Sequence, residues 1–576
     1  MAGFGGKQMS DGPAAEAWPT RAEEPPRKKE RRGRAAAVAV LILCLIMTLA
    51  FLVFVSSGRA SASVAWQRAA NKLTAMPGAV GFTDASNPNT TGASATTKPD
   101  VLLGGLLVPG FSRRSCRSRY QSPMYYKLSP YAPSSYLLKK LREYEARHEK
   151  CGPGTPLYAK SVEQLRSGRR STEATDTECN YLVFLPFNGL GNRMLSLLSA
   201  FLYALLTGRV LLVQFPDDFA DLFCEPFPDA TWALPPDFPV EHLSWLGANS
   251  DRSYGNLVAQ GKIVADAANA TAAQSALPPY VYVHLANDHG DMDSRFYCND
   301  DQLVLAKVSW LLLRADLYLV PSLYSIPEFH DELRRLFPAK ESVSHLLGRY
   351  LLHPTNSVWG MVTRYYHTYL AQAEQMIGVQ IRMFPFSTIP VDDMYNQILN
   401  CSRQENILPD IDDGDADTDT GSLGRASTKA ILITSLYADY YERIKSSYYE
   451  HAAKGGAMVG VFQPSHEERQ MMGQRKHHQK ALAEMYLLSF SDVLLTSGMS
   501  TFGYVSSVLA GIRPTMLLTA HDHKVPATPC VRAVSMEPCL HKVPRVKCPG
   551  KDVDKEDLQR HVKACEDLRW GIKLFD

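Results

Sequence analysis

The stretch Tyr181-Leu-Val-Phe-Leu-Pro-Phe-Asn-Gly-Leu-Gly-Asn-Arg-Met-Leu-Ser-Leu-Leu-Ser-Ala-Phe-Leu-Tyr203 decides the fold, because an apolar run stops at two glycines and resumes with helical spacing. The pattern predicts a strand, a tight turn and a helix. Gly189 and Gly191 would let the backbone approach another group closely, and the free N–H groups of the helix suit a phosphate. Arg193 would add a bidentate cation. A glycine-permitted corner between strand and helix explains the same residues equally well.

Further predicted helices and strands on both sides of this unit fit a parallel sheet. Tyr136–Glu149 has the pattern of a charged amphipathic helix, and Val210–Gln214 supplies the strand after the helix, so that strand, helix and strand alternate. A second set of runs, separated by helical stretches, predicts a second doubly wound lobe. These runs are Ile377–Arg382, Ala430–Ser435, Met458–Phe462 and Asp492–Ser497.

The first 100 residues predict a membrane anchor and a stem. Residues 1–34 hold eight basic and five acidic residues, a net charge of +3, and residues 35–57 hold no charge. At about 1.5 Å per residue, those 23 residues are long enough to cross a hydrocarbon core of roughly 30 Å. The basic cluster on the amino side predicts a type II protein with a retained anchor rather than a cleaved signal peptide. The composition of residues 58–100 predicts a flexible stem.

Charge and cysteine content narrow the function classes. The 61 basic and 59 acidic residues nearly balance, so the chain as a whole lacks the excess of positive charge that would attract nucleic acid. Of the eleven cysteines only Cys44 lies in the predicted span, and the even number left on the oxidising side favours disulfides over metal sites, with the pairing open. Asp410–Thr420 predicts a disordered insertion rather than a calcium loop. Three glycosylation sequons suit a lumenal location, at Asn89, Asn269 and Asn400.

Two segments place anion-binding groups at the carboxyl ends of the second set of strands. Arg382 ends the first run, where a guanidinium would enter the crevice in which ligands bind and could hold a phosphate bidentately. A surface ion pair is the alternative for this arginine. Thr496-Ser-Gly-Met-Ser-Thr-Phe-Gly-Tyr504 follows a strand and opens a helix, so it presents hydroxyl and N–H donors to an anion. An ordinary helix cap at Ser500 or Thr501 is the alternative here.

Taken together and in this order, these motifs resemble the plant xyloglucan fucosyltransferase family. The resemblance runs from about Leu102 to the end of the sequence. It rests on Gly104-Gly-Leu, Ser118-Arg-Tyr-Gln, Gly189-Leu-Gly-Asn-Arg, Val320-Pro-Ser-Leu, Gly348-Arg-Tyr-Leu, His353-Pro-Thr-Asn and Ser500-Thr-Phe-Gly-Tyr.

The resemblance implies an α/β fold with a GT-B-type pair of Rossmann-like lobes behind a single N-terminal transmembrane anchor. It also implies GDP-fucose as the donor. L-fucose would move with inversion, and without a metal or other cofactor, to the 2-hydroxyl of a terminal galactose on a cell-wall glycan, xyloglucan or arabinogalactan-type, in the Golgi. We expect an acceptor-side lobe at 101–365, a GDP-fucose-binding lobe at 366–535 and a cysteine-containing return segment at 536–576. The sequence leaves a homodimer open.

The resemblance also assigns roles to individual residues. Arg382 would grip the diphosphate, with Gln380 near the guanine. Wider fucosyltransferases often carry a second arginine directly after this one, and here that residue is Met383. The remaining donor-binding candidates are Gly189, Gly191, Asn192, Arg193, Ser497, Ser500, Thr501 and Phe502. Preorganised donors and a guanidinium can stabilise a departing GDP without a metal.

The acceptor hydroxyl must lose a proton, for which a carboxylate or histidine is expected. The resemblance associates Asp316 with the acceptor side, as base or acceptor binder, and a helix cap or an ion pair with Arg314 is its structural alternative. Asp288 and His289 compete with it. Asp291-Met-Asp293 is a D-x-D sequence, which holds manganese in GT-A-type glycosyltransferases. No apolar strand leads directly into it, so we expect a chance occurrence. A type II lumenal glycan-binding protein without turnover is the alternative from another class.

Overall fold

The computed structural model describes residues 102–127, 129–168, 179–263, 277–287, 292–412, 427–546, 548 and 558–576. The predicted cytosolic tail, membrane span and stem lie outside these residues, as do the sequons at Asn89 and Asn269. The candidates Asp288, His289 and Asp291 and most of the predicted acidic insertion also lie outside them. The described residues belong to one compact unit, residues 97–576.

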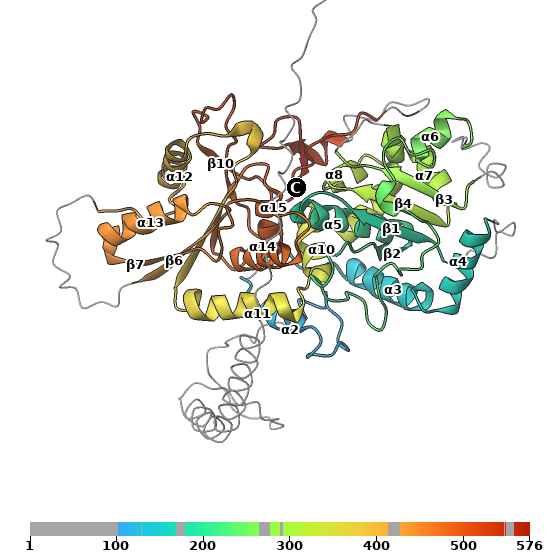
Figure 1. Cartoon of the computed structure of the whole chain (residues 1–576), viewed down its shortest axis with the longest axis horizontal. Helices are drawn as coiled ribbons and strands as arrows, with labels where there is room; N and C mark the ends of the chain where they lie inside the picture. Colours follow the sequence, from blue (N-terminus) through green and yellow to red (C-terminus); the bar gives the residue numbers. More distant parts are fainter. Residues whose placement is uncertain are drawn as a thin grey trace, which may run out of the picture. The chain divides into compact units, whose positions relative to one another are not determined.

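The strand, turn and helix predicted at 181–203 are present and form the centre of a four-stranded parallel sheet (Figure 1). All six residues of the first strand are buried, and the helix that follows ends at Gly208, whose φ of 63° suits glycine. Tyr181 stacks on Trp310 of the neighbouring strand at 4.0 Å between ring centroids. The strand order is β2-β1-β4-β3, with β1 Tyr181–Pro186, β2 Val210–Val213, β3 Tyr280–His284 and β4 Trp310–Ala315.

Helices pack around this first sheet. The predicted helix at 136–149 is α3, and Ser134 caps it by accepting the N–H of Leu137 at 3.0 Å. The helices are α2 Arg117–Gln121, α3 Ser135–Cys151, α4 Pro156–Ser167, α5 Leu190–Thr207, α6 Tyr254–Ala259, α7 Asn299–Leu305, α8 Val320–Leu323, α9 Pro327–Leu336, α10 Val343–Leu351 and α11 Asn356–Tyr365.

The second set of predicted runs forms a six-stranded sheet in the order β10-β9-β8-β5-β6-β7. Its strands are parallel except for the antiparallel edge pair β9 and β10. The four predicted runs are β5 Gln375–Ile381, β6 Thr428–Ser435, β7 Met458–Phe462 and β8 Val493–Ser497, joined by β9 Thr515–Leu517 and β10 Cys530–Arg532. The helices of this half are α12 Val391–Glu405, α13 Asp439–Glu450, α14 Arg475–Leu488 and α15 Thr501–Ala510. Two parallel α/β sheets are therefore present, as predicted.

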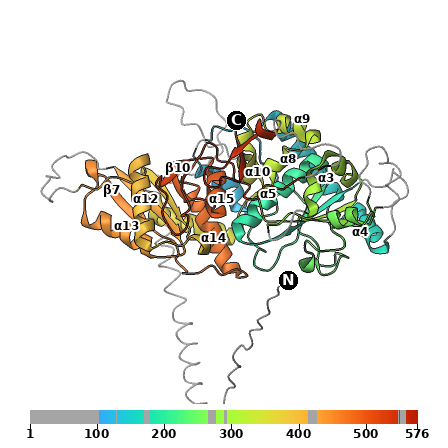
Figure 2. The same ribbon diagram turned by 90° about the horizontal axis from the view of Figure 1, so that it is seen from above.

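The two halves meet through a helical layer. In both views α5 and α10 of the first half lie beside α15 of the second, and the three helices pack against one another (Figures 1 and 2). A short antiparallel pair near the carboxyl end, β11 Val562–Ala564 and β12 Ile572–Leu574, returns to this region, where Leu540 pairs with Ile572. Because α5 and α15 each begin directly after a strand, this packing brings the two predicted anion-binding turns together.

The ten cysteines outside the predicted span form five disulfides, which confirms the expectation from their even number. Two bonds lie within the first half, one within the second, one within the return segment, and one joins the first half to the return segment. The pairs are Cys116–Cys224, Cys151–Cys179, Cys401–Cys530, Cys539–Cys565 and Cys298–Cys548.

Within the described residues, α5 is the one helix long and apolar enough to cross a membrane, and 78% of its apolar window is buried. It is therefore a core helix, and it does not bear on the predicted span at 35–57. Asn400, the sequon that the structure describes, is exposed on α12.

Candidate active site

A cavity of about 430 Å³ lies where the carboxyl ends of strands from both sheets meet. The turn after β1, the ends of β5 and β6, the segment before α14, α14 itself and the start of α15 all line it. Most of the predicted donor-binding residues are among the lining residues: Gly189, Gly191, Asn192, Gln380, Arg382, Ser500, Thr501 and Phe502. The fold therefore gathers residues that are more than 300 positions apart.

Arg382 follows the last residue of β5 and lines the cavity. Its backbone N–H donates to Ser497 Oγ at 2.8 Å, and its Nη2 donates to Gln470 Oε1 at 2.9 Å. Burial lowers the pKa of Arg382 below its usual value, although that value is so high that the guanidinium remains charged. The cavity therefore carries a fixed cation at the carboxyl end of β5.

Ser497 does not line the cavity but fixes two residues that do. Its hydroxyl accepts from Arg382, and its N–H donates to Gln380 Oε1 at 3.2 Å. These contacts tie β8 to β5 behind the cavity wall. Ser497, which was predicted to bind the donor directly, thus has the contacts of a supporting residue.

The turn from β8 into α15 lines the cavity with Met499, Ser500, Thr501 and Phe502. Ser500 is the N-cap of α15 and accepts the N–H of Gly503 at 3.5 Å. Its role as a helix cap is compatible with its predicted role in binding an anion, because it also lines the cavity. Gly503 has to be small, because a Cβ there would lie 2.8 Å from Thr496 and 3.0 Å from Gln380. Met499 has a φ of 61°, which is uncommon for a residue with a long side chain.

The glycine turn after β1 makes a close approach to this second turn. A Cβ on Gly191 would lie 2.6 Å from Thr501 Oγ1 and 2.9 Å from its backbone carbon. Thr501 Oγ1 donates to Asn192 Oδ1 at 3.0 Å. The close approach predicted for Gly191 is therefore made to Thr501 at the start of α15, and the two helix N-termini are joined at the edge of the cavity.

Arg193 is not among the residues that line the cavity. Its Nη1 donates to both carboxylate oxygens of Asp218 at 3.0 Å, and its Nε donates to Asn188 O at 2.7 Å. Burial would raise the pKa of Asp218, but the hydrogen bond and the charge of Arg193 outweigh it and hold that pKa below its usual value. Arg193 therefore holds the turn after β1 through a carboxylate, and its predicted phosphate contact stays a prediction.

Asp316 follows β4 and is 1% exposed. Its Oδ1 accepts the N–H of Asn287 at 2.8 Å, and its Oδ2 accepts from Asn188 Nδ2. Its backbone oxygen accepts from Asn192 Nδ2 at 3.0 Å. The carboxylate lies behind Asn192 and Asn287, which line the cavity, and has the contacts of a residue that anchors the turn. Its predicted role as base stays a prediction.

Asp293 of the D-x-D sequence is buried, and its carboxylate oxygens accept the N–H groups of Gly255 at 2.5 Å and His284 at 2.6 Å. Burial raises the pKa of Asp293 to about 6. In the part of the chain that the structure describes, the one group close enough to share a metal ion is Cys539, Cys565 and Asp567, and its two cysteines form a disulfide.

Sequence reasoning missed the wall that α14 contributes. Glu484 lines the cavity within an apolar stretch, hydrogen bonds to Ser465, and burial raises its pKa to about 8. A lone glutamate in Ala481-Leu-Ala-Glu-Met-Tyr-Leu-Leu488 was a usable signal. Glu467 pairs with Lys480 and with His477 nearby. His541 also lines the cavity, and its surroundings in the sequence gave no signal.

Comparisons with known proteins agree on one family. The family model described as xyloglucan fucosyltransferase matches residues 73–549. A galactoside 2-alpha-L-fucosyltransferase of Pisum sativum is 48% identical over 479 residues, covering 83% of this chain and 82% of the relative. The Arabidopsis thaliana protein of that name is 47% identical over 489 residues, covering 84% of each.

A solved structure, a variant of Arabidopsis thaliana FUT1 in complex with GDP, is 47% identical and has a TM-score of 0.74. The similarity covers 82% of this chain and 100% of that one. The two parallel sheets and the cavity between them thus occur on a chain that matches this family along most of its length. The chain belongs to the xyloglucan fucosyltransferase family.

Proposed function

We propose that this fucosyltransferase moves L-fucose from GDP-fucose, with inversion, to the 2-hydroxyl of a terminal galactose on a cell-wall glycan of the xyloglucan or arabinogalactan type. One observation carries the proposal: a single cavity joins a fixed guanidinium, a helix N-terminus and a buried carboxyl. Relatives named galactoside 2-alpha-L-fucosyltransferase, and a GDP complex of a similar protein, support the donor and the linkage.

The diphosphate fits the end of the cavity at β5 and α15. Arg382 supplies a planar cation that can hold two phosphate oxygens, and the free N–H groups of α15 add donors and a favourable dipole. These groups are in place before the reaction, so they can stabilise the charge that develops on GDP as it leaves. Transfer without a metal follows from this proposal, since the guanidinium and the backbone donors meet the phosphate charge.

The guanine fits the wall formed by α14. A guanine presents two adjacent N–H donors, at N1 and at its 2-amino group, which a carboxylate can accept together. Glu484 lines the cavity, and burial raises its pKa to about 8, so this carboxyl is mostly protonated near neutral pH. Glu467 and Lys480 act on it with opposite signs. GDP binding at pH 7 would therefore release a proton from Glu484.

An exposed aromatic surface on the first half suits the acceptor glycan. Trp245 is 78% exposed and stacks on His242 at 4.3 Å, in the turn Leu243–Trp245. Arg314 Nη2 donates to Leu243 O at 2.8 Å, and its guanidinium lies over the ring of Phe187, two residues before Gly189 of the cavity. A flat, supported indole offers the apolar face that a sugar ring can cover. We propose this surface for the acceptor chain.

We propose a lumenal location in the Golgi, behind the type II anchor predicted at residues 35–57. Five disulfides fit a compartment that is oxidising. A cysteine-reactive probe applied to sealed membranes would test the topology, with a single cysteine introduced into residues 1–34 as the reporter.

The test of the function uses the full chain in detergent micelles, GDP-fucose and a panel of galactose-ended oligosaccharides. We expect transfer to a galactose 2-hydroxyl, which methylation analysis of the product identifies. GDP binding without transfer to any member of the panel would favour the glycan-binding protein instead. A product linked at another hydroxyl would contradict the proposed linkage.

A further inference from the structure

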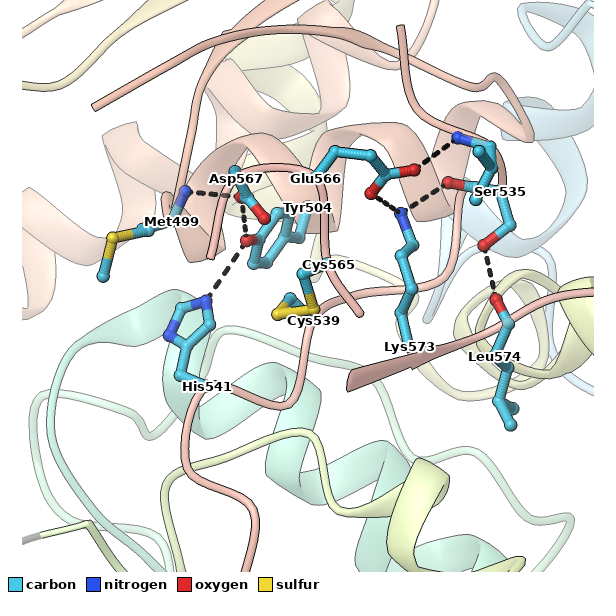
Figure 3. Close-up of polar contacts among 11 residues, drawn as sticks. Met499, Tyr504, Ser535, Cys539, His541, Cys565, Glu566, Asp567, Lys573 and Leu574 are labelled. Carbon is cyan, nitrogen blue, oxygen red and sulfur yellow. Dashed lines mark hydrogen bonds and ion pairs between the residues drawn. A yellow bond between two sulfur atoms is a disulfide. The ribbon is translucent and has the colours of Figure 1, made fainter. Parts of the chain in front are cut away.

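Three side chains from separate parts of the sequence form a hydrogen-bonded chain (Figure 3). Tyr504 of α15 donates its hydroxyl proton to Asp567 Oδ2, and His541 Nε2 lies 3.2 Å from the same hydroxyl. Asp567 Oδ2 also accepts the N–H of Met499 at 2.7 Å. His541 and Met499 line the cavity, so this chain connects the return segment at 536–576 to the donor site.

The disulfide Cys539–Cys565 holds the two ends of this chain. Each cysteine lies two residues before a member of the chain, Cys539 before His541 and Cys565 before Asp567. Figure 3 shows the bond beside the Tyr504 ring, with His541 and Asp567 on either side of the Tyr504 hydroxyl. The covalent link therefore fixes the separation of the imidazole and the carboxylate.

The hydrogen bonds determine which nitrogen of His541 carries the proton. A carboxylate is only an acceptor, so the single hydroxyl proton of Tyr504 is committed to Asp567. The Tyr504 oxygen can then only accept from His541, and Nε2 must be the protonated nitrogen. Nδ1 is left with its lone pair, and among the described residues it has no hydrogen-bond partner. Figure 3 shows this nitrogen turned away from Tyr504.

The charge states of the chain fit this arrangement. Burial lowers the pKa of His541, with the charge of Asp567 acting in the opposite direction, so the imidazole is neutral near pH 7. Burial raises the pKa of Tyr504 far above its usual value, and Asp567 and Glu566 reinforce this, so the phenol keeps its proton. Tyr504 and Asp567 are the titratable groups that face His541, and Lys573 lies beyond them, paired with Glu566.

We propose that His541 Nδ1 is the general base that takes the proton of the acceptor hydroxyl, and that Tyr504 and Asp567 are positioning residues. This inference rests on the proposed function. As the acceptor oxygen bonds to the anomeric carbon of fucose, the bond from that carbon to the phosphate oxygen breaks, and its electron pair leaves on GDP. The acceptor O–H bond breaks, and its proton moves to Nδ1, from which water later removes it.

His541 meets the requirements of a base better than Asp316 does. Asp316 is buried behind the cavity lining, and both of its carboxylate oxygens accept hydrogen bonds. His541 lines the cavity and keeps an acceptor nitrogen in Nδ1, and the Asp567 carboxylate can stabilise the imidazolium through Tyr504. Because burial lowers the pKa of His541, its imidazole is neutral at neutral pH and can accept a proton.

The decisive experiment compares His541→Gln with wild type in full-chain fucosyl transfer. Glutamine can still donate to Tyr504 but is not a base, so kcat should fall by about 10²-fold or more, the usual scale for general base catalysis. The Kd for GDP should stay within about twofold, and the decline of wild-type kcat at low pH should disappear. His541→Ala should regain turnover with added imidazole. His521→Gln, at a highly exposed histidine that does not line the cavity, is the matched control.

Tyr504→Phe separates positioning from structure, because it keeps the imidazole and removes only its hydrogen bond. We expect kcat to fall by about tenfold and its decline at low pH to shift, while KM for GDP-fucose stays unchanged. Wild-type turnover in His541→Gln, or a loss confined to GDP affinity, would overturn the assignment. Should His541→Gln fold poorly, failure of imidazole to rescue His541→Ala, together with normal kcat in Tyr504→Phe, would overturn it as well. If wild type itself transfers no fucose, the proposed function fails instead.

Discussion

Replacing Arg382 with lysine tests the diphosphate site directly, because lysine keeps the charge and loses the planar fork. The structure fixes the base of this side chain through the Ser497 hydroxyl and directs its guanidinium into the cavity beside Gln470. The fold should therefore be unaffected by the change, and the loss should come from the ligand. Thermal unfolding of the variant checks this premise.

The magnitude follows from the number of hydrogen bonds. A bidentate guanidinium makes two bonds to the phosphates, each to a charged group and each contributing about 1.5–3 kcal/mol. Lysine retains one bond, so Arg382→Lys should lower kcat/KM for GDP-fucose by about 10- to 150-fold, at about 1.4 kcal/mol for each factor of ten. Arg382→Ala loses both bonds and should lower it by about 10²- to 10⁴-fold.

The assay measures initial rates over a range of GDP-fucose concentrations, with GDP affinity from titration calorimetry. Arg443→Lys is the matched control, because Arg443 is an exposed arginine on α13 whose partner is Asp392 on the neighbouring helix. It should leave kcat/KM unchanged. If Arg382→Lys also worked at the wild-type rate, the bidentate reading of this site would be wrong.

Four further outcomes test other parts of the reasoning. Turnover should survive excess EDTA, and a loss that manganese restores would instead support a metal site at Asp293. Asp316→Asn should lower the Tm and keep the acidic limb of the kcat profile, whereas a fall in kcat of about 10²-fold or more at unchanged Tm would make Asp316 the base. The folded Glu484 carboxyl keeps its proton up to a pKa of about 8, while the unfolded chain loses it near its usual value, so stability falls as pH rises between these values. The Tm of Glu484→Gln should therefore depend less on pH in this range than the Tm of wild type. An equal pH dependence of Tm in the two proteins would contradict the raised pKa. Trp245→Ala should raise KM for long acceptors more than for short ones, with Trp570→Ala, at another exposed tryptophan, as the control.

Local patterns predicted the elements that are locally determined. The apolar runs at 377–382, 430–435, 458–462 and 492–497 correspond to β5, β6, β7 and β8 in that order. They could be predicted because a short buried strand consists of consecutive apolar residues. Strand β4 was not predicted, since Arg314 interrupts its apolar run. That arginine is buried, and its guanidinium reaches backbone oxygens of a loop about 70 residues earlier, a contact that no local window contains.

The candidate site also contains residues that local sequence patterns reveal and residues that they do not. The motifs around Arg382 and Ser500 could be found because a strand end and a helix start define where ligands bind in parallel sheets. The partner of Arg193 could not be found, because many carboxylates could have paired with it and only the fold selects Asp218. His541 could not be predicted for the same reason, since its proposed role depends on the contacts among His541, Tyr504 and Asp567.

The contact between Tyr504 and Asp567 also constrains how the protein is made. It joins residues 63 positions apart, and the Cys298–Cys548 disulfide joins residues 250 positions apart. Met499 and Asp567 are 68 positions apart, so at a synthesis rate of about 5–20 residues per second the turn at Met499 waits roughly 3–14 s for its anchoring carboxylate. The growing chain therefore holds both sheets before it holds the contacts that position His541, and the site is complete only after Asp567 has emerged and Cys539 and Cys565 have been oxidised.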